Sequence, residues 1–190
     1  MDSSKLSFKF FLTDGSHFEQ EVIVPVLHTW IQKHLIEGHL LIDVADYKHV
    51  QNGPGTVLVA HEGNFSTDKA IGGAPGLLYM RKTPLDGDLA TRIRQVLKTT
   101  LSAASQLEKE EKLGGKVRFR TDNPIFRIYD RLEAPNTPAT FEAVKSTLET
   151  VLKQVWGSAA KLEYKQDVEG VFEVRIAETA VALPALLSRI

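Results

Sequence analysis

The sequence predicts an α+β fold in which helices pack on one face of an antiparallel or mixed sheet. Two observations lead to this class. Short apolar runs of strand length are interleaved with longer stretches whose apolar residues recur at helical spacing. Each half of the chain also shows a strand, a helix and then an antiparallel pair or meander, which suggests two related β-α-β-β halves. We therefore expect a single domain over residues 1–190, with structural halves at 1–113 and 114–190.

The first third of the chain predicts one strand, one helix and three further strands. Alternation of apolar and polar residues over 6–12 indicates a half-buried strand. From Phe18 to Leu35 the apolar residues recur at helical spacing, and Gly38 is the expected stop. Three apolar runs that follow have the character of covered strands, with Gly/Pro-rich turns at 52–55 and 71–75 between them; they are residues 40–44, 56–61 and 76–80.

The rest of the chain predicts three helices and four strands. A long apolar stripe indicates a helix from Asp86 or Asp88 to Leu113, and Thr137 followed by Pro138 begins a second one that ends at Trp156. The remaining elements are strands at 117–120, 125–129, 162–164 and 171–176, a hairpin turn through Val168, Glu169 and Gly170, and a terminal helix over 183–190.

The composition excludes several classes of protein. The formal net charge is −1, from 23 basic and 24 acidic residues, which argues against a broad nucleic-acid surface. Cysteine is absent, so disulfides, Cys-ligated zinc and iron–sulfur clusters are excluded and a reducing compartment is expected. No apolar run reaches the length of a membrane span, and the first residues lack the pattern of a signal peptide. These features predict a soluble, cytoplasmic protein that does not associate with membranes.

Histidine is concentrated in the first third of the chain, at His17, His28, His34, His39, His49 and His61. Imidazole titrates near physiological pH and is the commonest metal ligand, so this crowding marks a candidate region. His34 is predicted to lie beside Trp30 in the core stripe of the first helix. His28 lies on the flank of that helix and could face a cleft, whereas His17 and His39 are expected in exposed turns.

Six residues of this region are candidates for binding a ligand or a metal: His28, Asp43, Asp46, His49, His61 and Glu62. Asp43, Asp46 and His49 are three residues apart, so they would share a face if this segment leaves its strand as a helical turn. With His61 and Glu62 from an adjacent strand, they would suit a divalent metal such as Zn, Mn or Fe(II). If the strand continues instead, the two aspartates point to opposite faces and the group is a set of ordinary polar edge residues.

A second candidate is an anion site made by two glycine-bearing loops and a nearby cation, with the residues Gly53, Gly55, Gly72, Gly73 and Arg81. Glycine lets backbone amides approach an anion closely. Neither loop has the spacing of a known phosphate-binding motif, and simple turns are the alternative interpretation. Arginines that alternate with apolar residues in the later strands indicate a charged solvent face, with Glu163 and Glu173 as cross-strand partners; they are Arg118, Arg120, Arg127, Arg131 and Arg175.

No complete catalytic motif is present, since Gly-x-Ser-x-Gly and His-Glu-x-x-His are both absent. The sequence therefore predicts a soluble intracellular ligand-binding or interaction protein, whose partner is a small molecule or a second copy of the chain joined through the sheet as a homodimer. The alternative is a small metal-dependent enzyme with a His/Asp site in residues 28–62 and a divalent metal as its cofactor. The substrate and the pathway have no signal in the sequence.

Overall fold

The computed structural model describes residues 3–166 and 170–190, and it confirms the α+β class. The strands are β1 (Leu6–Phe11), β2 (Leu41–Asp46), β3 (Thr56–Ala60), β4 (Gly63–Ser66), β5 (Gly76–Arg81), β6 (Ile125–Ile128), β7 (Lys161–Lys165) and β8 (Phe172–Ala177). The helices are α1 (Gln20–Lys33), α2 (Leu89–Lys109), α3 (Pro138–Trp156) and α4 (Leu183–Leu187), with 3-10 turns η1 (Ile71–Gly73) and η2 (Glu111–Leu113).

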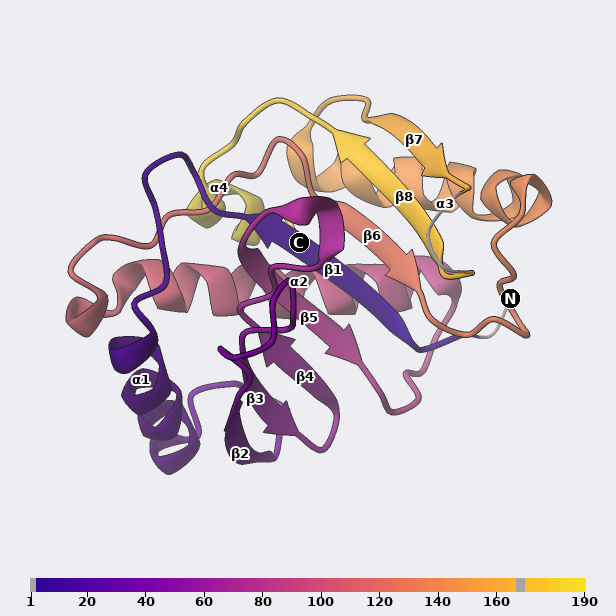
Figure 1. The fold of residues 1–190 in the computed structure, drawn as a ribbon. Helices are drawn as coiled ribbons and strands as arrows, with labels where there is room; N and C mark the ends of the chain where they lie inside the picture. The colour runs from indigo at the N-terminus through magenta and orange to yellow at the C-terminus, as the bar shows by residue number, and fades with distance from the viewer. Residues whose placement is uncertain (1–2, 167–169) are drawn as a thin grey trace.

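One sheet contains all eight strands in the order β2-β3-β4-β5-β1-β6-β8-β7, and every neighbouring pair is antiparallel. The two halves of the chain share a connection pattern. Each begins with a central strand, β1 or β6, continues through a helix to an outer edge of the sheet, and returns strand by strand to the centre (Figure 1). The first half returns through four strands and the second through two, so the first is the larger part of the sheet.

The main core lies between the sheet and helices α2 and α3, which run behind the sheet in Figure 1. Phe8 of β1 packs on Phe126 of β6 with ring centroids 5.1 Å apart, and Phe10 stacks on Trp156 at the end of α3. Both helices begin at side-chain caps, because Asp88 accepts a hydrogen bond from the Thr91 amide and Thr137 accepts one from the Thr140 amide. Among the described residues, no helix combines the length and apolar character required to cross a membrane.

Helix α1 ends earlier than the sequence predicts. It stops at Lys33, and His34 adopts the left-handed conformation, with φ 50° and ψ 47°, as the C-cap residue. The chain therefore turns away before His34 can join the apolar stripe of Trp30, and its side chain is exposed. The prediction that His34 is a core histidine is wrong, because helical spacing does not indicate where a helix is capped.

Two strand predictions also need correction. The expected strand at 117–120 is reduced to a single bridge between Leu12 and Phe119. Strand β4 was not expected, since Phe65 is its only large apolar residue, but it is hydrogen-bonded to β3 and β5 on its two sides. Pairing on both sides stabilises a strand whose own β propensity is low.

The remaining differences concern the ends of elements. Helix α2 ends at Lys109 and is followed by η2, and helix α4 ends at Leu187. Val168 and Glu169 of the predicted hairpin turn lie outside the described residues, although β7 and β8 pair in antiparallel register.

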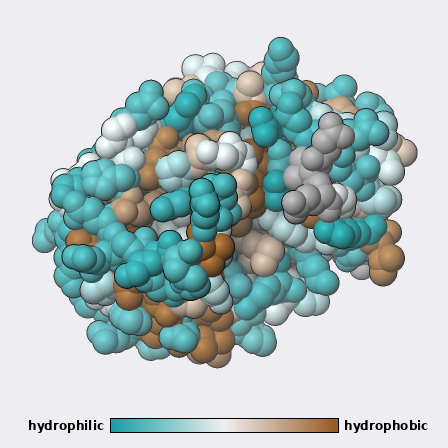
Figure 2. Space-filling view, viewed as in Figure 1, coloured by the Kyte–Doolittle hydropathy of each residue, from teal (hydrophilic) through white to brown (hydrophobic). Residues whose placement is uncertain are grey.

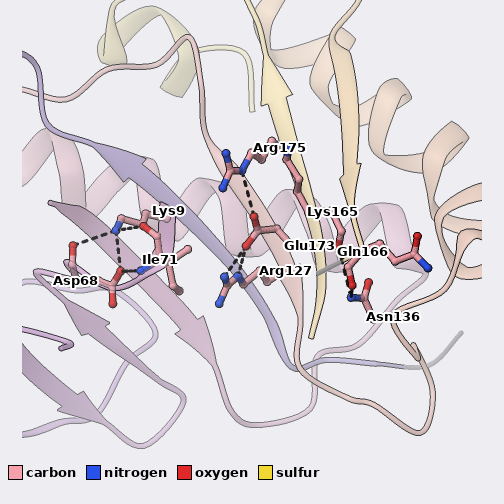
Figure 3. A network of polar contacts seen from close by, with 9 residues as sticks. All are labelled: Lys9, Asp68, Ile71, Arg127, Asn136, Lys165, Gln166, Glu173 and Arg175. Carbon is pink, nitrogen blue, oxygen red and sulfur yellow. Dashed lines mark hydrogen bonds and ion pairs between the residues drawn. The ribbon is translucent and has the colours of Figure 1, made fainter. Parts of the chain in front are cut away.

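A buried lysine holds the segment that covers the second face of β1. Lys9 points away from the helices and is fully buried. Its ammonium donates to Asp68 Oδ1 at 2.7 Å, to the Ile71 carbonyl at 2.6 Å and to the Asp68 carbonyl at 3.0 Å (Figure 3). It also donates to the Ala74 carbonyl at 2.7 Å. Burial lowers the pKa of Lys9, and the Asp68 carboxylate opposes that shift. The ammonium thus binds residues 68–74 to the central strand.

Replacing Lys9 by methionine is expected to reduce the free energy of unfolding by about 3–5 kcal/mol, because the buried Asp68 carboxylate loses its charge partner. Urea unfolding measures this change. Lys5→Met is a matched control on the same chain segment, since Lys5 is exposed, and it is expected to change stability by no more than about 0.5 kcal/mol. Adding Asp68→Asn to Lys9→Met should restore part of the loss. A Lys9→Met protein as stable as Lys5→Met would contradict this role.

Candidate functional site

The predicted metal residues of β2 do not converge. β2 continues as a strand through Asp46, so the helical turn that would bring Asp43, Asp46 and His49 to one face does not form. Asp43 accepts the Val44 amide, and Asp46 accepts Gln20 Nε2 and the Lys48 amide. These carboxylates are therefore exposed edge residues with local partners, as the alternative interpretation proposed.

The candidate histidines lie on three different segments of the chain. His28, His49 and His61 all have exposed side chains. In the part of the chain that the structure describes, no group of three or more His, Cys, Asp or Glu residues could hold a metal ion. His28 lies on α1, His49 in the β2–β3 connection and His61 in the β3–β4 turn, and the histidine crowding in the sequence does not produce such a group among the described residues.

The glycine loops are built as turns. The Gly53 and Gly73 amides donate to the Val50 and Ala70 carbonyls, at 3.2 and 3.3 Å. Gly55 lies so close to Thr67 that a Cβ would be 2.4 Å from the threonine Oγ1, and Gly72 is packed in the same way on Phe11. These observations favour the turn interpretation over an anion site at the glycines. Arg81, the cation proposed beside them, lies instead on the wall of a separate pocket.

This pocket has a volume of about 650 Å³ and lies between the loop after α1, the end of β5 and helix α2. An apolar part is contributed by Leu35, Ile36, Leu85 and Val96. The other lining residues are polar or aromatic, apart from Gly38: Glu37, His39, Tyr79, Arg81, Gln95, Lys98, Thr99, Ser102 and Gln106. A concave site with an apolar wall and a few placed polar groups is typical of small-molecule binding.

His39 and Tyr79 form a directed hydrogen bond at this pocket. His39 Nδ1 lies 3.0 Å from the Glu37 carbonyl, which can only accept, so Nδ1 carries the proton of the neutral ring. Nε2 is then an acceptor, and the Tyr79 hydroxyl 2.7 Å away donates to it. The geometry therefore assigns one tautomer to His39 and one direction to the bond.

Burial keeps both partners neutral. It lowers the pKa of His39, and Arg81 adds to that effect, while the bond to the Glu37 carbonyl and the Glu62 carboxylate oppose it. Burial also raises the pKa of Tyr79, against the opposing influence of Arg81. Near pH 7 the pair is consequently an imidazole and a phenol rather than two ions.

The charged residues beside the pair are fixed by backbone groups. Arg81 Nε donates to the Thr83 carbonyl at 3.1 Å, which holds the guanidinium at the end of β5. Glu62 accepts the Leu40 amide at 2.7 Å. Burial alone would raise the pKa of Glu62, but the Leu40 and Glu62 amides, with His39 and His61 nearby, lower it. Of the residues proposed from the sequence, Arg81 thus lines this pocket and Glu62 interacts with His39.

Gly63 makes room for the Tyr79 ring. A Cβ on Gly63 would lie 2.7 Å from Tyr79 Cε2 and 2.8 Å from its hydroxyl oxygen. The ring also packs on Phe65 with centroids 4.5 Å apart, and Phe65 in turn contacts His39. Strand β4, which the sequence does not predict, therefore supplies both the space and the packing that bring Tyr79 to His39.

Helix α2 supplies a polar wall. The residues that line the pocket recur at helical spacing, three or four apart, beside the apolar stripe of the same helix; they are Gln95, Lys98 or Thr99, Ser102 and Gln106. The spacing of these polar residues is visible in the sequence. On its own, however, it indicates only a solvent-exposed helix face and not a pocket wall. His39 had no comparable signal. Its predicted solvent exposure is wrong because its ring bonds to Tyr79, and this contact could not be read from the sequence since the two residues are forty positions apart.

The second face of the sheet carries the predicted charged pairs. Arg127 of β6 lies 2.5 Å from Glu173 of β8, and Arg175 lies 3.3 Å from the same carboxylate (Figure 3). Glu173 is only 1% exposed, so part of this network is buried rather than solvated. Hydrophilic residues cover most of this face, with smaller hydrophobic areas between them (Figure 2). The paired arginines favour a structural role over an RNA platform.

The two edge strands differ in character. β7 presents Lys161, Glu163 and Lys165, a charged pattern that discourages strand addition. At the other edge, Leu40 just before β2 and Ile42 within it are 60% and 55% exposed. The Val44 amide of β2, however, already donates a hydrogen bond to the Asp43 carboxylate. Self-association through the sheet stays a prediction.

No protein-family model matches this chain, and no curated protein matches it. The chemistry of the pocket therefore rests on the groups that line it: a neutral His39–Tyr79 pair, two cations and a wall of amides and hydroxyls.

Removing the Tyr79 hydroxyl tests the pair. Tyr79→Phe leaves the His39 Nε2 acceptor without its donor in a half-buried site, and we expect a loss of about 1–2 kcal/mol in the free energy of unfolding. Tyr47→Phe is the matched control, because Tyr47 is 42% exposed. Urea unfolding of both proteins measures the difference, and equal stabilities would show that the hydroxyl is not held as described.

Proposed function

We propose that the protein binds a small organic anion in the pocket between α2 and the ends of α1 and β5. The observation that carries this proposal is the position of Arg81 and Lys98 on the wall of a pocket of about 650 Å³. The only acidic lining residue in the described chain is Glu37, so these two cations leave an excess of positive charge. A carboxylate, sulfonate or phosphate group would be attracted to it.

The remaining wall suggests the rest of the ligand. Leu35, Ile36, Leu85 and Val96 offer apolar contacts, and the amides and hydroxyls of α2 offer hydrogen bonds. A ligand with a small apolar or aromatic body and one acidic group would use both parts. Because the strand end and the helix are both packed elements of the fold, the pocket is formed before the ligand arrives, which reduces the entropy lost on binding.

Benzenesulfonate is a suitable probe because it is anionic throughout the accessible pH range, and benzenesulfonamide is its neutral counterpart. We expect chemical-shift changes in ¹⁵N-labelled protein at the pocket residues with the sulfonate, and at least tenfold weaker binding of the sulfonamide. Lys98→Met should weaken sulfonate binding several-fold. Lys109→Met is the matched control, since Lys109 is exposed near the end of the same helix. Equal affinities for the two probes, or equal effects of the two variants, would overturn the proposal.

A further inference from the structure

The His39–Tyr79 bond can exist in two directions. In the neutral state Nδ1 donates to the Glu37 carbonyl and the Tyr79 hydroxyl donates to Nε2, over 2.7 Å. A protonated imidazole carries a proton on both nitrogens, so Nε2 must then donate to the Tyr79 oxygen. The Tyr79 hydroxyl then no longer donates to His39, and its proton is available to another acceptor. Tyr79 and His39 both line the pocket, where such an acceptor would bind.

We propose that the pocket takes up its anionic ligand together with one proton on His39, and that the Tyr79 hydroxyl then turns from the imidazole to the ligand. This inference rests on the proposed function, because it concerns the same pocket and the same anion. Proton uptake adds a positive charge at the wall and a hydroxyl donor aimed into the pocket. Both changes stabilise the bound anion, and neither is present in the ligand-free state near pH 7.

The surrounding charges make His39 responsive to an added anion. Arg81 on β5 opposes protonation of the ring, whereas Glu62, before β4, favours it. Glu37 and Tyr79 are its hydrogen-bond partners, His61 lies near Glu62, and Lys98 of α2 is on the pocket wall. An anion bound beside Arg81 and Lys98 would offset these cations. The balance around His39 would then shift toward the imidazolium.

The sign of the pH dependence follows from linkage. If the bound state holds one more proton than the free state, affinity for the anion rises as pH falls, by up to about tenfold per pH unit between the two titrations of His39. Once His39 is protonated in both states, the rise ends. A neutral ligand should show no such increase, because it offers no negative charge to the imidazolium.

The test is the dissociation constant of benzenesulfonate at pH 5.5, 6.5 and 7.5, measured by NMR titration at constant ionic strength. We expect at least a fivefold gain in affinity from pH 7.5 to 5.5 in the unaltered protein. His39→Gln should remove this gain, because glutamine can bond to Tyr79 but does not titrate. His49→Gln is the matched control, since His49 is exposed, and it should retain the gain.

The outcomes separate the two proposals. Binding of the sulfonate with the same affinity at all three pH values overturns proton uptake and leaves the anion pocket intact. A gain that persists in His39→Gln also overturns it, because another group must then take up the proton. Absence of binding at every pH overturns both proposals.

Discussion

The structure depends on a fully buried ammonium group. Lys9 sits in the central strand of the sheet, where a charged side chain is costly unless each of its protons is accepted. The Asp68 carboxylate and the carbonyls of Asp68, Ile71 and Ala74 meet that requirement from one short segment. Asp68 also accepts the Ile71 amide, so the carboxylate that pairs with Lys9 also organises the turn in which it lies. The charge therefore forces residues 68–74 into a single arrangement over the sheet.

The same contacts determine where the pocket residues lie. The Gly76 amide, at the start of β5, donates to the Asp68 carbonyl, so this strand begins directly at the Lys9 site. β5 then pairs with β1, with Phe8 opposite Tyr79, and it ends at Arg81. A Cβ at Gly76 would lie 2.3 Å from the Phe10 carbonyl oxygen, which explains the glycine at this close crossing. The register fixed by Lys9 thus carries through to the tyrosine and the arginine that line the pocket.

The sequence predicted most of the fold and little of the site. Apolar periodicity identified α2 and α3 because each buries a continuous stripe, and Asp88 and Thr137 marked their starts. It did not identify β4, which is held by pairing on both sides, or the left-handed cap at His34. For the site, Arg81 and Glu62 were among the residues proposed, but His39 was not. Histidine frequency along the chain reports composition, whereas the His39–Tyr79 bond depends on strand order, which local patterns do not contain.

Hydrogen exchange of the Lys9→Met protein, followed by mass spectrometry under conditions where the protein stays folded, tests this dependence most directly. If Lys9 sets the register of β5, exchange should become faster at residues 67–75 and also at residues 76–81, while β7 and β8 keep their protection. The Lys5→Met protein should match the unaltered chain throughout. Faster exchange confined to residues 67–75, with β5 unchanged, would contradict the account, because the pocket strand would then hold its position without the buried ammonium.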